Sequence, residues 1–216
     1  MISPPGAGKG TQKELLAKRY GLVSIVTGDL VRELRSKAET GDPLAVAVKE
    51  RYDQGIPQPD EVILEVIRRN LAELPLEKGI IFDAFPLSLG QAQGFEEIIK
   101  EFLLPRPIVL YIKVSEDEAV ERLGKRRVCP KCKRVFYPLS PNYASGKCNV
   151  CGVDFVVRDD DKEEVVRERF KQYEERMKNL QEYYQNKDEL IVINGEQTVE
   201  EVFKEILRKL EDYLQK

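Results

Sequence analysis

Short apolar runs alternate with longer amphipathic stretches along the whole chain, and few folds are compatible with this alternation. Runs rich in Ile, Val and Leu predict buried strands at residues 22–25, 79–82, 108–114 and 190–193. The stretches between them have the residue spacing of helices. This order predicts an α/β fold in which helices cover both faces of a parallel sheet. A chain of 216 residues has room for one such domain with inserts.

Two regions break this alternation. Residues 27–55 have helical patterns and no strand of their own, and residues 128–157 contain all four cysteines. We therefore expect a core made of residues 1–26, 56–127 and 158–216, from which the two inserts project. Polar residues that commonly cap helices precede several helical stretches, and we expect N-caps at Asp42, Ser88, Ser115 and Thr198.

Composition excludes several classes of enzyme. The chain has no histidine, so Ser/His/Asp triads, histidine-ligated zinc hydrolases and phosphohistidine chemistry are excluded. Reactions that depend on positioning and charge stabilisation remain, and phosphoryl transfer is the leading example. A net charge of −3 speaks against nucleic acid or an anionic membrane as a partner. With no apolar run of membrane-spanning length and no signal peptide, a cytoplasmic protein is expected.

A glycine-rich segment, Pro-Gly-Ala-Gly-Lys-Gly-Thr-Gln at residues 5–12, precedes the first helical pattern. It resembles the phosphate-binding loop G-x-x-x-x-G-K-[ST], although Ser3 stands at the first glycine and Gly10 separates Lys9 from Thr11. In such loops, backbone N–H groups and a helix N-terminus surround the phosphates. Lys9 would add a positive charge there. The alternative is a glycine-rich turn that only caps a helix.

Only Met1 and Ile2 precede this loop, where a central parallel strand is usual. Each buried aliphatic residue of such a strand would stabilise the fold by about 1.5 to 3 kcal/mol. We therefore expect a shortened first strand. Either the sequence is a shortened form of a longer gene product, or the sheet position is filled in an unusual way.

The four cysteines form two C-x₂-C pairs, Cys129 with Cys132 and Cys148 with Cys151, separated by fifteen residues. This spacing is typical of a tetrahedral metal site. Four thiolates leave no coordination position open for water, so the site would be structural, with Zn²⁺ as the first candidate and iron as the second. Two alternatives are a pair of disulfides and a zinc ribbon that binds nucleic acid.

Four further segments carry a family resemblance. They are Thr-Gly-Asp-Leu-Val-Arg at 27–32, Asp-Ala-Phe-Pro-Leu-Ser-Leu-Gly-Gln-Ala at 83–92, Arg-Leu-Gly-Lys-Arg-Arg at 122–127, and Arg-Asp-Asp-Asp at 158–161 with Arg167 and Arg169 beyond it. In order and spacing, together with the loop and the cysteines, they resemble the adenylate kinases of the long type with a metal-bearing lid. The resemblance covers essentially the whole chain.

The resemblance implies a fold, a reaction and partners. The fold is a P-loop three-layer α/β/α domain with a parallel sheet, a helical insert at 27–55 that binds a nucleoside monophosphate, and a zinc-ribbon-like lid at 128–157. The reaction is transfer of the γ-phosphoryl group of Mg-ATP to AMP, with Mg²⁺ and a structural Zn²⁺ as cofactors. The resemblance also implies a monomer that binds neither membranes nor nucleic acid.

The resemblance also implies roles for individual residues. Catalytic roles fall to Lys9, Arg126, Arg158 and Arg169. ATP would be bound by Gly6, Ala7, Gly8, Lys9, Gly10, Thr11, Arg122, Arg126, Val135, Phe136 and Gln197. AMP would be bound by Thr27, Arg32, Ile56, Gln58, Ala84, Leu87, Gln91, Arg158 and Arg169. Asp83 would orient Mg²⁺ through water. The alternatives are solvated surface roles for the arginines and a helix-capping role for Asp83.

The chain departs from the family pattern on the acceptor side. Leu87 stands where the family has the arginine that grips the AMP phosphate, and Ala84 replaces a glycine. Gln58 replaces an aliphatic residue near the acceptor base, and Lys125 replaces a glycine at the lid entrance. These departures leave other readings open: a kinase for UMP, CMP or a deoxynucleotide, an ATP-binding homologue with an impaired acceptor site, and, as the weakest, a nucleic-acid-binding zinc protein.

Overall fold

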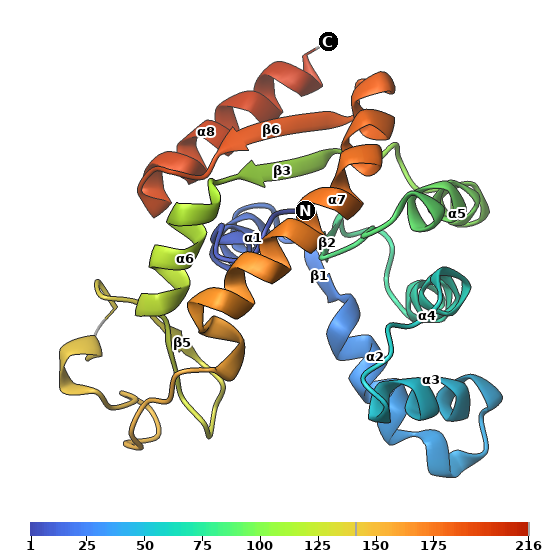
Figure 1. Ribbon diagram of the computed structural model, residues 1–216. Coiled ribbons are helices and arrows are strands. Elements are labelled where there is room, and N and C mark those ends of the chain that lie inside the picture. Colours follow the sequence, from blue (N-terminus) through green and yellow to red (C-terminus); the bar gives the residue numbers. More distant parts are fainter. Residues whose placement is uncertain (141, 216) are drawn as a thin grey trace.

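The computed structural model describes residues 1–140 and 142–215 and has the expected α/β architecture (Figure 1). The strands are β1 (Val23–Val26), β2 (Ile80–Asp83), β3 (Val109–Lys113), β4 (Arg127–Val128), β5 (Val135–Phe136) and β6 (Leu190–Asn194). The helices are α1 (Lys9–Tyr20), α2 (Thr27–Ser36), α3 (Pro43–Asp53), α4 (Asp60–Ala72), α5 (Leu89–Glu101), α6 (Glu116–Lys125), α7 (Glu163–Asn186) and α8 (Val199–Leu214). In the described ranges, no helix combines the length and apolar character needed to cross a bilayer.

Strand β3 is buried on both faces because its side chains alternate between two helical layers. On β3, Leu110 and Ile112 join a cluster with residues of α1 and α8, such as Leu16 and Ile206. The intervening Val109 and Tyr111 join another cluster with Met177, Leu180 and Tyr184 of α7. A third cluster lies where α4 and α5 pack against β1 and β2. Packing between these layers fixes the positions of the strand ends. Several candidate site residues lie at or just after these ends.

The centre of the sheet has the shortened first strand that the sequence predicts. β1 pairs with β2 and β3 pairs with β6, both in parallel, but no ladder joins the two pairs in the described chain. Met1 and Ile2 lie between them. The Ile2 N–H donates to Leu110 O at 2.9 Å, Ile112 N–H donates to Ile2 O at 3.2 Å, and the Met1 amine donates to Phe82 O at 2.7 Å. The first strand is thus reduced to a single bridge, between Ile2 and Tyr111.

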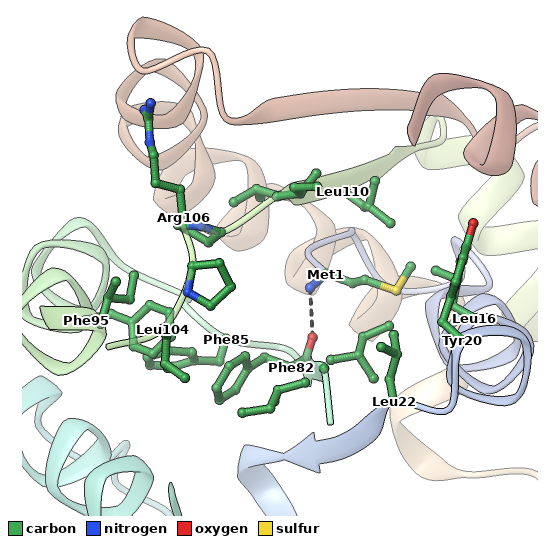
Figure 2. A pocket seen from close by; sticks show the side chains of 18 of the residues that line it. Met1, Leu16, Tyr20, Leu22, Phe82, Phe85, Phe95, Leu104, Arg106 and Leu110 are labelled. Carbon is green, nitrogen blue, oxygen red and sulfur yellow. Dashed lines mark hydrogen bonds between the residues drawn. The ribbon is translucent and has the colours of Figure 1, made fainter. Parts of the chain in front are cut away.

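Beside this bridge lies an apolar slot of about 450 Å³ between β2 and β3 (Figure 2). Its lining includes Leu16, Leu22, Phe82, Phe85, Leu104 and Leu110, and Met1 projects into it from the chain start. Among the described residues, no strand ladder joins β2 to β3 across this slot. The slot is lined mainly by apolar side chains and lies where a strand between β2 and β3 would run.

Local signals position the inserts. Asp42 caps α3, where its side chain accepts the Leu44 N–H at 3.0 Å, and Pro43 occupies the first helical position. Residues 27–53 form α2, the short helix η1 (Ala38–Thr40) and α3, with no strand among them. Figure 1 shows this helical segment and the cysteine-bearing segment projecting from the same side of the core, apart from each other.

Candidate active site

The glycine-rich loop turns sharply into the N-terminus of α1. Gly6 and Gly8 both have a φ of 81°, in the left-handed region that favours glycine. A Cβ on Gly6 would also lie 3.0 Å from the backbone of Ala119, so this position combines backbone freedom with a close approach to α6. Gly8 is the N-cap residue, and no side chain caps α1. The first turn of α1 is therefore available to bind an anion through its N–H groups.

Lys9 and Lys13 converge on Asp83 at the end of β2. Lys9 Nζ donates to Asp83 Oδ1, and Lys13 Nζ lies 3.3 Å from Asp83 Oδ2. Burial, and second the charge of Lys13, lower the pKa of Lys9 to about 8. Asp83 thus pairs with the two lysines and does not cap a helix, and its side chain remains 13% exposed at the loop. This is the position from which a carboxylate could orient a hydrated Mg²⁺ ion.

Two of the candidate catalytic arginines are held by aspartates of η3 (Asp159–Asp161). Arg126 makes a two-pronged contact with Asp161, through Nε–Oδ2 at 2.9 Å and Nη2–Oδ1 at 2.5 Å. Arg169 donates to the backbone and side chain of Asp160, both at 3.0 Å. Arg158 directly precedes η3, and its guanidinium contacts no carboxylate within the described ranges. The aspartates orient the arginines and offset their charge in the absence of phosphates.

The other ATP candidates fall into two groups. Arg122 and Gln197 meet at the end of β6, where Arg122 donates to Gly195 O at 2.8 Å and Gln197 donates to Asn194 O at 2.9 Å. Val135 and Phe136 lie in the cysteine-bearing segment. Val135 is exposed, but Phe136 is buried against Phe155, with ring centroids 4.4 Å apart. Phe136 therefore contributes to the core of that segment.

The acceptor candidates of the helical insert are dispersed. Thr27 is buried at the start of α2, and its hydroxyl has no hydrogen-bond partner in the described part of the chain. Arg32 pairs with Asp29 one turn earlier, and both are exposed. Ile56 is exposed, whereas Gln58 donates to Val48 O at 3.0 Å. Among the described acceptor candidates of this insert, the Thr27 hydroxyl and the Gln58 carbonyl oxygen are buried without a hydrogen-bond partner.

A second group of acceptor candidates follows β2. Gln91 spans two elements: its Oε1 accepts the Leu87 N–H at 2.8 Å, and its Nε2 donates to Asp60 Oδ1 at 2.9 Å. Ser88 donates to the other oxygen of Asp60 at 2.7 Å. Gln91, expected to contact the acceptor base, thus uses both ends of its amide within the protein. The Leu87 side chain packs against the apolar cluster beneath α7.

The two residues that replace family glycines, Ala84 and Lys125, differ in backbone conformation. Ala84 has a φ of 56°, a conformation that costs a residue with a Cβ about 1 kcal/mol or more. Lys125 lies in the last turn of α6 and is not among the residues with positive φ. The side chain of Lys125 therefore causes no backbone strain, because this position is helical. The strain falls on Ala84, next to Asp83.

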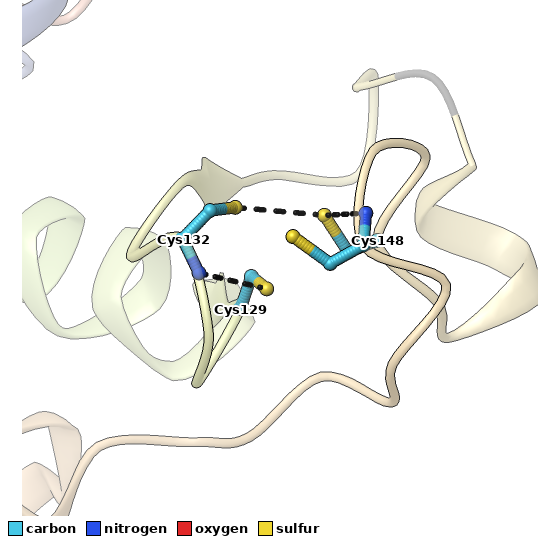
Figure 3. A group of neighbouring side chains, drawn as sticks. Cys129, Cys132 and Cys148 are labelled. Carbon is cyan, nitrogen blue, oxygen red and sulfur yellow. Dashed lines mark hydrogen bonds between the residues drawn. The ribbon is translucent and has the colours of Figure 1, made fainter.

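The four cysteines converge as their spacing predicts (Figure 3). Their sulfur atoms all lie within 4.8 Å of one another, and the Sγ atoms of Cys132 and Cys148 are 3.7 Å apart. All four are free thiols, so the alternative of two disulfides is wrong. The N–H of Cys132 donates to Cys129 Sγ, and that of Cys151 donates to Cys148 Sγ, both at 3.4 Å. Burial opposes ionisation of Cys129, but backbone N–H groups bring its pKa down to about 6.

Such a cluster fits a tetrahedral ion, because Zn–S bonds of about 2.3 Å place thiolates about 3.8 Å apart. Few apolar residues surround it. Phe136, Phe155, Tyr143 and Val153 are its main apolar neighbours. A segment with so small an apolar core depends on another source of stability, and a metal supplies one.

Sequence reasoning missed the partners of the charged candidates. Asp160 and Asp161 were part of a family motif without an assigned role, and Lys13 had none. For Lys13 a signal was present, because Lys9 and Lys13 are four residues apart and so share one face of a helix. For Asp161 no local signal exists, since its partner Arg126 is 35 residues away.

Comparison with known proteins agrees with this geometry. A model of the adenylate kinase family matches residues 1–189. The adenylate kinase of Archaeoglobus fulgidus is 39% identical over 97% of this chain and 96% of its own length. The adenylate kinases of Petrotoga mobilis and Thermodesulfovibrio yellowstonii are 40% and 37% identical, over 98% and 97% of this chain and 96% and 97% of their own lengths. No observation favours a pyrimidine nucleotide kinase or a nucleic-acid-binding zinc protein. The chain therefore belongs to the adenylate kinase family, enzymes that transfer a phosphoryl group between ATP and AMP.

Proposed function

We propose that the protein transfers the γ-phosphoryl group of Mg-ATP to AMP and that the loop before α1 holds the donor. The observation that carries this proposal is the placement of Lys9 in the first turn of α1, behind two glycines with positive φ and opposite Asp83. A helix N-terminus with a lysine binds the β- and γ-phosphates. The hydrated Mg²⁺ would be oriented by Asp83 and would neutralise charge on the phosphates.

Three arginines would stabilise the transferred group. Arg126 and Arg169 are pre-oriented by Asp161 and Asp160, and Arg158 has no carboxylate partner in the part of the chain that the structure describes. Guanidinium groups bind phosphate oxygens in pairs and hold charge that develops in the transition state. We assign these three arginines to the phosphates of both nucleotides. Arg122 and Gln197 would contact ATP from the end of β6.

The acceptor would lie between the helical insert and the segment after β2. The free hydroxyl of Thr27 and the side chain of Arg32 are its proposed contacts on α2. Leu87 cannot hold a phosphate, because it has no charge and packs against an apolar cluster. A phosphate contact of this kind contributes about 1.5 to 3 kcal/mol. We therefore expect AMP to bind weakly, and Gln91 to support the Leu87 backbone in addition to any contact with the base.

The two inserts would close over the nucleotides and exclude water, which would otherwise hydrolyse ATP. We assign residues 27–55 to AMP, residues 128–157 to a lid that holds Zn²⁺ through its four cysteines, and the rest to the core. By resemblance to the family, we propose a cytoplasmic monomer. Sedimentation at micromolar concentration tests the oligomeric state.

A coupled assay of ADP formation tests the proposed function. Purified protein with Mg-ATP should form ADP when AMP is added, and less when UMP or CMP is added. The Lys9→Met variant should lose at least 100-fold in turnover, or about 2.7 kcal/mol of transition-state stabilisation. Lys18→Met, at an exposed position in the last turn of α1, is the matched control and should retain activity. Full activity of Lys9→Met would contradict the proposal.

A further inference from the structure

Two ammonium groups share the carboxylate of Asp83, and only one of them has a place in the proposed reaction. Lys9 contacts Oδ1, and Lys13 lies 3.3 Å from Oδ2. The Lys13 side chain is 15% exposed, so it is held in the site and does not extend into solvent. It contacts no other carboxylate within the described residues. Burying an ammonium group to this extent is costly unless the group is paired, so Lys13 depends on Asp83 as its counter-ion.

The two lysines share one face of α1, because they are four residues apart in the same helix. Lys9 is in the first turn, next to the loop, and Lys13 lies one turn deeper, about 6 Å further along the axis. Both therefore approach Asp83 from the same side. Lys9 is the nearer of the two to the anion-binding end of the helix.

Binding of ATP would change the counter-ions of the Asp83 carboxylate. When Lys9 turns to the phosphates, Asp83 loses one counter-ion while its side chain stays largely enclosed. An enclosed carboxylate without a counter-ion is strongly disfavoured. Lys13 is already within reach of the second oxygen and needs no rearrangement to remain there.

We propose that Lys13 is a positioning residue that keeps Asp83 neutralised when Lys9 moves to ATP, so that its fixed charge partly replaces Mg²⁺ at this carboxylate. The inference rests on the proposed roles of Lys9 and Asp83. With Lys13 present, release of Lys9 from Asp83 is easier, and the added positive charge favours the phosphates of metal-free ATP. The same charge competes with the hydrated Mg²⁺ ion for Asp83. Lys13 therefore lowers the dependence of ATP binding on Mg²⁺.

Equilibrium binding without turnover measures this effect. Calorimetric titrations measure the dissociation constant of ATP in excess EDTA and in excess Mg²⁺. The readout is the dissociation constant without metal divided by the dissociation constant with Mg²⁺. Lys13→Met should weaken metal-free ATP more than Mg-ATP and so increase the ratio by about threefold to tenfold. Lys13→Arg keeps the charge and should restore most of the wild-type ratio. Lys18→Met, on the same helix but exposed, should leave the ratio unchanged.

A general structural role would give a different pattern. If Lys13 only stabilised the fold or contributed to the overall charge, Lys13→Met would change both dissociation constants by the same factor or leave both unchanged. The ratio would then stay the same, and this result would overturn the inference. Thermal unfolding of each variant shows whether it is folded, and Lys13→Gln replaces Lys13→Met if the latter does not fold. Lys9→Met separates the two proposals. If it leaves both affinities unchanged, the proposed function of the loop fails, and the inference about Lys13 fails with it.

Discussion

Lys9 and Asp83 form an ion pair that joins the first turn of α1 to the end of β2, across 74 residues of sequence. Neither residue is fully exposed, and the pair lies beside the phosphate-binding loop. Lys9, which we assign to the phosphates, is thus paired with Asp83, which we assign to Mg²⁺. ATP binding has to replace this internal ion pair by contacts between Lys9 and the phosphates. The affinity for ATP therefore depends on the charges of Lys9 and of the groups around it.

The first prediction concerns pH. The pKa of Lys9 is lowered to about 8, mainly by burial, so the free protein loses this charge as the pH rises above about 8. The bound phosphates favour the charged form, and ATP affinity should therefore fall above pH 8, by up to about tenfold per pH unit. Titrations from pH 6.5 to 9.5 measure this fall. Because Lys13 is the second cause of the shift, Lys13→Met should move the fall to higher pH. Constant affinity up to pH 9.5 would be inconsistent with the lowered pKa.

The second prediction concerns Ala84, which has a φ of 56° immediately after Asp83. Glycine adopts this conformation without the penalty that a Cβ incurs. Ala84→Gly should therefore raise the free energy of unfolding by about 1 kcal/mol, or about 2 to 4 °C in Tm. The control is Ala92→Gly in α5, a buried helical position that should lose about 1 kcal/mol or more. Differential scanning calorimetry compares the two variants, and a lower Tm for Ala84→Gly would contradict the account of strain.

Local signals predicted the starts of α3, α5, α6 and α8 correctly. Ser88, Ser115 and Thr198 each accept a backbone N–H three residues later, as expected of N-caps. The four core strands lie within about one residue of their predicted positions, because each is a short run of mostly apolar, β-branched residues. N-caps and short apolar strands depend on residues that are close together in the sequence, so they can be predicted from one sequence.

Features that depend on distant residues could not be predicted in the same way. A shortened first strand is expected from the sequence, but the apolar slot beside it depends on how β2 and β3 pack around the one-residue bridge at Ile2. The pairing of Arg126 with Asp161 depends on the position of a whole insert between them. The motifs identified charged residues of the site, but not which carboxylate each arginine or lysine contacts before a ligand binds.

The third prediction tests the acceptor side. Leu87→Arg restores a guanidinium where the family has one, and the KM for AMP should fall by about tenfold or more, with a smaller change in the KM for ATP. Because Leu87 packs against an apolar cluster, the variant should also lose some stability, which a Tm measurement records. Leu87→Met keeps the packing without the charge and should leave the KM for AMP unchanged. An unchanged KM for Leu87→Arg would show that another cation already occupies this role.

The fourth prediction concerns the four cysteines. The purified protein should contain about one equivalent of metal per chain, with zinc and iron distinguished by elemental analysis. Cys148→Ser removes one buried thiolate and should release the metal and unfold residues 128–157, since the apolar neighbours there are few. The loop before α1 is formed by the core and not by this segment, so ATP should still bind, with turnover reduced. Leu139→Ser, at a fully exposed position in the same segment, is the control. Complete loss of ATP binding would contradict a purely structural role for the metal.

The last prediction uses the slot between β2 and β3. A short apolar extension before Met1, such as Ile-Val-Ile, would continue in the direction of the Met1 amine and reach the lining formed by Leu22, Leu104 and Leu110. Three buried aliphatic side chains contribute about 5 to 9 kcal/mol, and ordering three residues costs about 3 to 6 kcal/mol. A net gain of about 2 to 3 kcal/mol would raise the Tm by about 4 to 12 °C. An extension of Ser-Asp-Ser has the same length but cannot be buried there, and it should give no gain. Equal Tm values for the two extensions would show that the slot does not accept a strand.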